Sequence, residues 1–290
     1  MTEGDVRVTT PVRDTGKRKL NSHFRSEARR TLFAGDNYYR SVLSHLICGL
    51  FSGGALYLSF YAPDLIKTVF GGSLGEESTA LLSASVNTVL YLVSAFLFFA
   101  FFSGVYLLAS AMKDEPDTAE GDPDPADLSM MLRPVGSHRS LSRTAGVFII
   151  LAAELALAVI PAVYVISRVS GTGIDPRAAA AVKIVSVIAA SLLSLFFIIL
   201  LVPMPYALGA EPDAGVLELY RKSAKAAVRG AFRCVLMLLS FIPHLILSVL
   251  SFGVMFFAYT LPYMTLSMAK LGEYLYNITY FERKKTDEQA

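Results

Sequence analysis

Long runs of apolar residues alternate with polar segments along the chain. Four runs, at residues 42–62, 86–112, 145–167 and 181–208, each meet the roughly 20 apolar residues that a helix needs to cross a bilayer. The pattern predicts an all-α, polytopic membrane protein. Two transmembrane hairpins are expected, at residues 41–112 and 145–208.

A fifth apolar region, residues 234–268, allows two assignments. It is too long for one span of about 30 Å and too short for two full spans of about 20 residues each. It therefore forms either two tight spans or one span with a re-entrant segment. Pro243 and Pro262 lie inside it and are expected to kink its helices. The S-F-G sequence at 251–253 marks the expected reversal, because glycine adopts the backbone angles of a sharp turn.

The distribution of Lys and Arg favours two spans in this region. Cytoplasmic segments of membrane proteins are enriched in these residues. If six helices cross the membrane and both termini are cytoplasmic, the outer loops and span ends hold only Lys67, Arg168, Arg177 and Lys183 of the 26 basic residues. Five spans would leave the basic C-terminal segment outside. We therefore expect a bundle of six transmembrane helices, with the last hairpin at residues 234–270.

The segments between the hairpins are expected to be cytoplasmic. Residues 1–40 form a basic tail that ends in a surface helix, and residues 271–290 extend the sixth helix. Residues 113–144 are an acidic, proline-rich linker, of which 114–127 lack the apolar side chains needed for a core and are expected to be mobile.

Residues 209–233 predict an amphipathic helix on the inner leaflet. Apolar residues recur there at three- and four-residue steps, and the opposite face is basic. This face should meet anionic headgroups and consists of Arg221, Lys222, Lys225 and Arg229.

Two stretches of the chain also resemble a known family. They are FRSEARRTLFAGDNYYRSVL before the first span and the region from 207 to 276, with Ser223, Gly230, L-S-F at 239–241 and L-P-Y at 261–263. Both resemble the bacterial integral-membrane family called domain of unknown function 975, whose second half is similar to membrane domains of glycerophosphodiester phosphodiesterases. The resemblance implies a location in the bacterial plasma membrane and no particular chemistry.

Composition and motifs narrow the function classes. The chain is 54% hydrophobic and 17% charged, and its net charge of +2 is too small to indicate a nucleic-acid surface. Walker, G-x-S-x-G and H-E-x-x-H motifs and His/Cys clusters are absent from the sequence, so we expect neither an enzyme, a metal site nor a cofactor. The only cysteines, Cys48 and Cys234, should be free, buried thiols.

Two ionisable residues lie deep in predicted spans. Glu154 and His244 are each about ten residues from the cytoplasmic end of a span, where an ionised acidic or basic side chain costs roughly 2.5–3.5 kcal/mol. One hypothesis is that the two face each other and exchange a proton or contact a polar solute. The alternative is that each is satisfied by a hydrogen bond, Glu154 in protonated form to a Ser, Thr or Tyr, and serves only to fix helix packing.

Gly49 and Gly53 have the spacing that allows close approach of helices. The sequence leaves open whether they pack within the chain or between two copies of it.

These features favour a non-enzymatic membrane scaffold or accessory subunit, because the spans carry no charged pathway. Its partners would be the bilayer itself and another membrane protein or a second copy. The rival is a small-solute or proton-coupled transporter that uses Glu154. A lipid-handling protein is a third interpretation, and it would need a lipid-sized groove beside the 213–232 helix.

Overall fold

We describe the chain from a computed structural model, over residues 17–70, 75–112, 127–170 and 176–287. In these residues the protein is all-α, with no strand. The expected N-terminal tail up to residue 16 and almost all of the 114–127 linker fall outside the described residues.

Two long hairpins dominate the fold. The first joins α2 (Asn37–Phe70) to α3 (Glu76–Ala111), and the second joins α4 (His138–Ser170) to α5 (Pro176–Leu200). In the first hairpin, the Phe51 and Phe101 rings stack at 4.8 Å, and the Ser94 hydroxyl donates a 2.8 Å hydrogen bond to the carbonyl of Ser52. The expected hairpins are thus present, with helices that mostly extend past their apolar runs.

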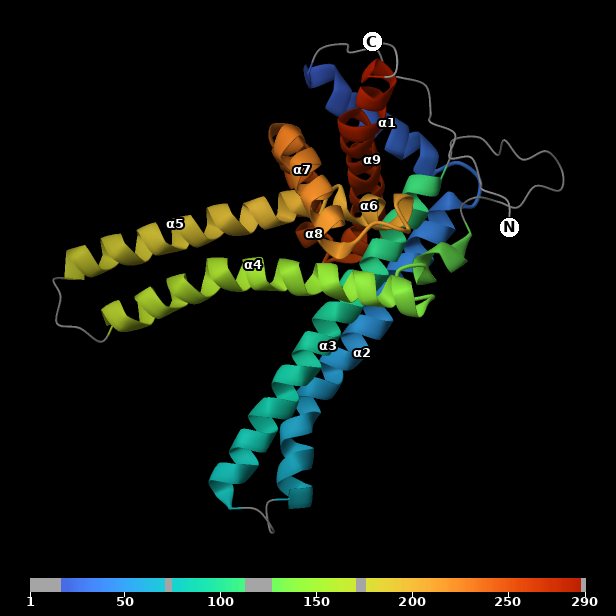
Figure 1. Cartoon of the computed structure of the whole chain (residues 1–290). Coiled ribbons are helices and arrows are strands. Elements are labelled where there is room, and N and C mark those ends of the chain that lie inside the picture. Colours follow the sequence, from blue (N-terminus) through green and yellow to red (C-terminus); the bar gives the residue numbers. More distant parts are fainter. Residues whose placement is uncertain (1–16, 71–74, 113–126, 171–175, 288–290) are drawn as a thin grey trace.

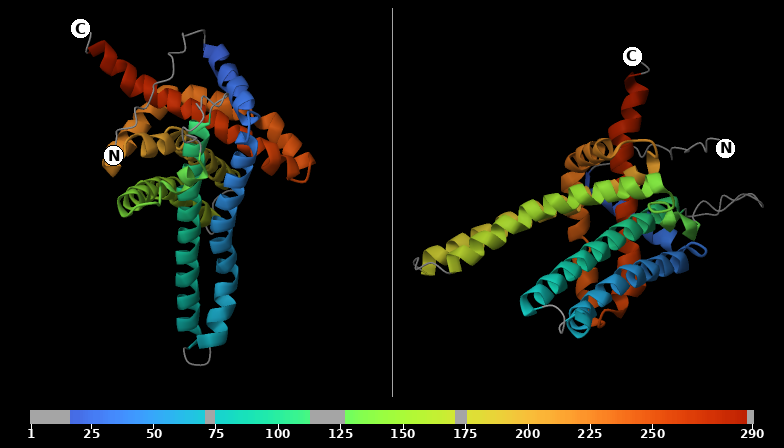
Figure 2. Two further views of the ribbon diagram at one scale, coloured as in Figure 1. Left: turned by 90° about the vertical axis from the view of Figure 1, so that its right-hand side faces the viewer. Right: turned by 60° about the horizontal axis from the view of Figure 1, so that its bottom comes forward.

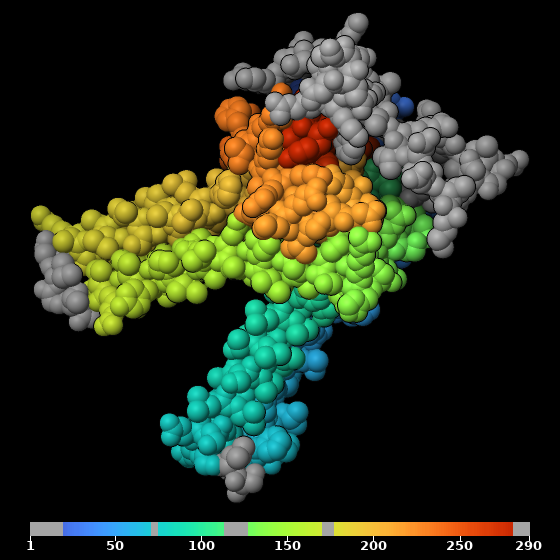
Figure 3. Space-filling model, viewed as in Figure 1, coloured from blue at the N-terminus to red at the C-terminus, as the bar shows by residue number. Residues whose placement is uncertain are grey.

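The two hairpins leave a common junction in different directions (Figures 1 and 2). The space-filling view shows them as separate arms with nothing between them (Figure 3). The two hairpins therefore do not pack along their length into the expected bundle of six helices (Figures 1 and 3). Apolar faces surrounded by lipid gain no hydrophobic free energy by packing against each other, so apolar patterning alone does not dictate a bundle.

The junction is built from shorter elements. They are α1 (Lys17–Leu32), η1 (Leu128–Leu132), α6 (Met204–Ala210), α7 (Val216–Leu239), α8 (Ile242–Leu250), the π-helical turn η2 (Phe256–Thr260) and α9 (Leu261–Asp287). The most deeply buried side chains gather here, among them Leu32, Leu108, Met204, Leu219 and Tyr276. The hydrophobic core of the protein is this junction, and the arms extend from it.

Among the residues that the structure describes, five helical segments are long and apolar enough to cross a membrane: 37–70, 76–111, 138–169, 177–210 and 216–250. Only 11% of the most apolar stretch is buried in each of the 138–169 and 177–210 segments. The expected sixth span falls in η2 and α9 and is not among the five.

The last third of the chain differs most from the expectation. Helix α7 begins at Val216, inside the predicted surface helix at 209–233, and continues without a break into the first limb of the hairpin at 234–270, where it ends at Leu239. Pro243 lies in the first turn of α8, where its missing N–H costs nothing, so it begins a helix rather than kinking one. The reversal at 251–253 is confirmed: Phe252 and Gly253 have φ of 52° and 82°.

Candidate functional site: a polar network at the helix junction

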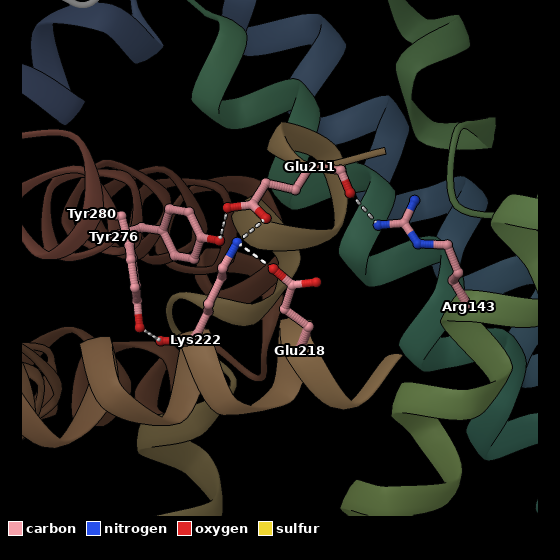
Figure 4. Close-up of polar contacts among 6 residues, drawn as sticks. All are labelled: Arg143, Glu211, Glu218, Lys222, Tyr276 and Tyr280. Carbon is pink, nitrogen blue, oxygen red and sulfur yellow. Dashed lines mark hydrogen bonds and ion pairs between the residues drawn. The ribbon is translucent and has the colours of Figure 1, made fainter. Parts of the chain in front are cut away.

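The densest group of polar contacts lies where α4, α7 and α9 meet the loop between α6 and α7 (Figure 4). The Glu211 carboxylate is its centre. One oxygen accepts a 2.6 Å hydrogen bond from the Tyr276 hydroxyl, and the other lies 2.5 Å from Lys222 Nζ. Both charged side chains are about a quarter exposed or less, at 21% for Glu211 and 26% for Lys222. Glu211 therefore links α7 to α9.

Lys222 has further partners on its own helix and on α9. Its ammonium lies 2.8 Å from Glu218, one helical turn earlier, and 5.9 Å from the centre of the Tyr280 ring. The Tyr280 hydroxyl donates a 3.2 Å hydrogen bond to the Lys222 carbonyl. These contacts hold the lysine in one place, with its charge directed into the network.

Helix α4 joins the network through two arginines. The Arg143 guanidinium donates hydrogen bonds to the carbonyls of Glu211 and Pro212, the latter at 2.7 Å. Arg139 lies 2.9 Å from the Asp213 carboxylate. The loop between α6 and α7 is thereby fixed to the base of the second hairpin.

A second set of contacts ties α1 to α9. Lys270 Nζ lies 3.2 Å from Glu27 and 3.3 Å from the carbonyl of Met112 at the end of α3. Burial raises the pKa of the nearby Glu273 carboxyl, an effect that Lys270 partly opposes and Glu27 adds to. Helix α1 is also joined to α7, because the Asn21 side-chain amide donates a 3.1 Å hydrogen bond to the carbonyl of Arg233.

The network suits fixing helices rather than chemistry. Burial, followed by the hydrogen bond to Glu211, holds the pKa of Tyr276 far above its ordinary value, so the hydroxyl keeps its proton. Lys222 is paired with the carboxylates of Glu211 and Glu218. Arg143 donates to backbone carbonyls. Within the parts of the chain that the structure describes, His, Cys, Asp and Glu form no group of three suited to a metal ion.

Sequence reasoning missed most of this network. Glu211 and Tyr276 are far apart in the chain, and neither interrupts an apolar run. Glu211 falls inside the predicted surface helix at 209–233, whereas the structure places it in the loop before α7. Lys222 was predicted to face headgroups but is turned inward by Glu211. The other three residues of the predicted basic face are exposed, and their contact with headgroups stays a prediction: Arg221, Lys225 and Arg229.

The structure does not bring Glu154 and His244 together. Glu154 lies on α4 and accepts a hydrogen bond from the Tyr220 hydroxyl of α7. His244 lies on α8, with its ring 5.6 Å from that of Tyr263 and 5.8 Å from that of Phe241. They have different neighbours because α8 turns away from α7 at residues 240–241 and packs against η2. The hydrogen bond from Tyr220 agrees with the alternative hypothesis, in which Glu154 is bonded to a Ser, Thr or Tyr.

The two glycines predicted for helix packing face outward. A Cβ placed on Gly49 or Gly53 meets no atom within 4 Å, so neither packs against another helix of the described chain. Packing within the chain is therefore not their role, and a contact between copies stays a prediction. Cys48 and Cys234 are free and buried, which confirms the expectation.

Comparison with known proteins adds no relative: the chain matches no family model, no curated protein and no solved structure.

Proposed function

We propose that the chain is a multi-span membrane protein that acts as a non-enzymatic scaffold or accessory subunit of a membrane complex. The observation that carries the proposal is the pair of apolar arms, which diverge from one junction, as Figure 3 shows. A pathway through a membrane needs helices that surround it. Helices whose apolar faces are not covered by the rest of the chain can instead contact lipid and other membrane helices.

The polar junction supports the same proposal. Its ion pairs and hydrogen bonds fix the base of the second hairpin to α7 and α9 through Arg143, Glu211 and Tyr276. A rigid base with two long arms can hold partner helices at a set spacing. From the resemblance to domain of unknown function 975 and the distribution of Lys and Arg, the proposal includes the bacterial plasma membrane as location, with both termini cytoplasmic.

A photo-crosslinking amino acid at exposed positions of each arm tests the scaffold role. Leu58 on α2 and Leu157 on α4 are 59% and 74% exposed. We expect both positions to give a defined adduct with a membrane protein or a second copy of this chain, in cells expressing the chain at low level. Leu108, which is fully buried, is the matched control and should give no adduct to another chain. Adducts with lipid alone at both exposed positions would contradict the proposal.

Transport through Glu154 is the second candidate. It is favoured by one observation: the second carboxylate oxygen of Glu154 is buried and has no hydrogen-bond partner among the described residues. Against it, the surface hollow on the same helix does not include Glu154 and is lined by apolar side chains only, from Ala153, Ala156, Leu157, Ile160 and Pro161. A water-filled route would need polar groups at this point.

A further inference from the structure

The tip of the third hairpin, residues 249–257, exposes apolar side chains where a water-exposed turn would carry polar ones. Phe252 is 98% exposed, and its neighbours are also largely exposed: Val249, Leu250, Val254 and Phe257. No Asp, Glu, Lys or Arg occurs between Arg233 and Lys270. By contrast, Glu76 and Glu77 begin the second helix of the first hairpin, and Arg177 lies near the tip of the second. The third tip thus lacks the charged residues that lie near the tips of the other two hairpins.

The backbone of this tip pairs its own N–H groups. The N–H groups of Phe252, Gly253 and Val254 donate to the carbonyls of Val249, Ser248 and Ser251, at 2.8–3.2 Å. The N–H of Met255 donates to the Ser251 hydroxyl at 3.0 Å. In hydrocarbon there is no water to satisfy backbone groups, so a segment that enters it must pair them internally. The N–H groups of this turn meet that requirement.

Two polar side chains of the hairpin, Ser248 and Thr260, point inward, while Ser251 at the tip is half-buried. The hydroxyls of Ser248 and Thr260 lie 2.9 Å apart, between the two limbs, and the residues are 3% and 0% exposed. The hairpin is therefore apolar outside and polar inside. That arrangement fits lipid as the surroundings of the tip and does not fit water.

The contacts of α1 limit how deep the tip can reach. Tyr263 of α9 donates a 3.2 Å hydrogen bond to the carbonyl of Arg25 in α1, and the Arg25 guanidinium donates to the Tyr263 hydroxyl at 3.4 Å. Because α1 carries six Lys and Arg residues, it lies at the headgroups or above them. Ten residues separate Tyr263 from Gly253, which is about 15 Å of helix and half of a core of about 30 Å.

We infer that residues 242–260 form a re-entrant hairpin, which inserts its apolar tip among the acyl chains of the cytoplasmic leaflet and returns to the same side. This differs from the two short spans predicted from the sequence. It leaves four crossing helices, α2 to α5, and keeps both termini on one side. The inference needs only a membrane location and does not depend on the scaffold role.

A fluorophore at the tip tests the inference. The full chain with Cys48→Ala and Cys234→Ala is labelled with an environment-sensitive fluorophore at Phe252→Cys and placed in vesicles of phosphatidylcholine and phosphatidylglycerol. We expect nitroxides on the lipid acyl chains to quench it several-fold more strongly than aqueous iodide does. The same label at the exposed Glu77→Cys is the matched control and should show the opposite order.

Labelling of intact cells with an impermeant maleimide separates re-entry from crossing. Phe252→Cys should stay unmodified, while Glu77→Cys reacts. Reaction of Phe252→Cys in intact cells would mean that the hairpin crosses the membrane. Strong iodide quenching, or a label protected from both iodide and lipid nitroxides, would place the tip in water or under a protein partner. Each of these results would overturn the inference. Val249→Cys, at a position that is 78% exposed, repeats the test if the Phe252 variant does not fold.

Discussion

The hydroxyl of Tyr276, which is fully buried on α9, donates a 2.6 Å hydrogen bond to the carboxylate of Glu211 in the loop before α7. The second oxygen of that carboxylate pairs with Lys222, so a single side chain connects two helices. Burial of a carboxylate is favourable only when its charge and its lone pairs are satisfied. The junction therefore depends on both partners being in place.

We expect Glu211→Ala to lower the free energy of unfolding by about 1.5–3 kcal/mol, because it removes the hydrogen bonds that the Glu211 carboxylate accepts from Tyr276 and Lys222. Denaturant unfolding of the purified chain in mild detergent measures this. Glu218→Gln is the matched control, since it breaks the other ion pair of Lys222 at a side chain that is 56% exposed. Its effect should be much smaller, because exposed pairs are screened by solvent. Equal losses in the two variants would show that the network contributes nothing beyond surface electrostatics.

Stability should depend on the titration of Glu273. Burial raises the pKa of its carboxyl above the ordinary value of a glutamate, so over part of the pH range the folded state keeps a proton that the unfolded state releases. In the pH range between the two pKa values, the unfolded state therefore binds fewer protons than the folded state. This contribution to stability is therefore lost as pH rises through that range. Lys270, which lowers the pKa, and Glu27, which raises it, are the charged groups that act on this carboxyl.

Glu273→Gln should remove this pH dependence and make the chain more stable than wild type at neutral pH. The measurement is the unfolding midpoint of both proteins from acidic to neutral pH, compared as a difference curve. The exposed Glu77→Gln should give a curve parallel to that of wild type. A Glu273→Gln curve that is also parallel would contradict the prediction.

Apolar runs predicted the two long hairpins because about 20 consecutive apolar residues have few other uses in a protein of this size. They did not predict how the hairpins are arranged, since lipid satisfies an apolar helix face as well as another helix does. The third hairpin was harder still. Its limbs are short, and its reversal was found from Gly253, but its limited depth follows from the Arg25–Tyr263 contact, which joins residues far apart in the chain.

The candidate site was predicted only where one residue conflicted with its surroundings. Glu154 drew attention because an acid in an apolar run is costly, and the type of its partner, a tyrosine, was among those expected. Glu211, Arg143 and Tyr276 gave no such signal, because each lies in a polar or mixed segment where charged residues and tyrosines are common. Their importance arises from the tertiary contacts alone.

The Tyr220–Glu154 contact gives a prediction that separates the two candidate functions. Tyr220→Phe removes the donor and should cost about 1 kcal/mol of stability. Glu154→Gln keeps an acceptor for Tyr220 and should leave folding and the cellular phenotype unchanged if the chain is a scaffold. Thermal unfolding and complementation of a deletion strain measure the two effects. Loss of complementation by a normally folded Glu154→Gln would favour the transporter, because only titration has been removed.

The glycines provide a test of the junction and of the arms together. Gly272 on α9 packs so closely against the turn after α5 that an added Cβ would overlap the backbone oxygen of Val202. Backbone cannot move aside as a flexible side chain can, so Gly272→Ala should lower the free energy of unfolding by about 1–3 kcal/mol. Gly53→Ala, at a position with nothing within 4 Å, is the matched control and should stabilise α2 by about 0.5–1 kcal/mol. Denaturant unfolding measures the stability of both variants. Crosslinking between copies of the chain in membranes measures their self-association. A neutral Gly272→Ala would contradict the close approach of α9, and a Gly53→Ala chain that loses self-crosslinking would place Gly53 in a contact between copies.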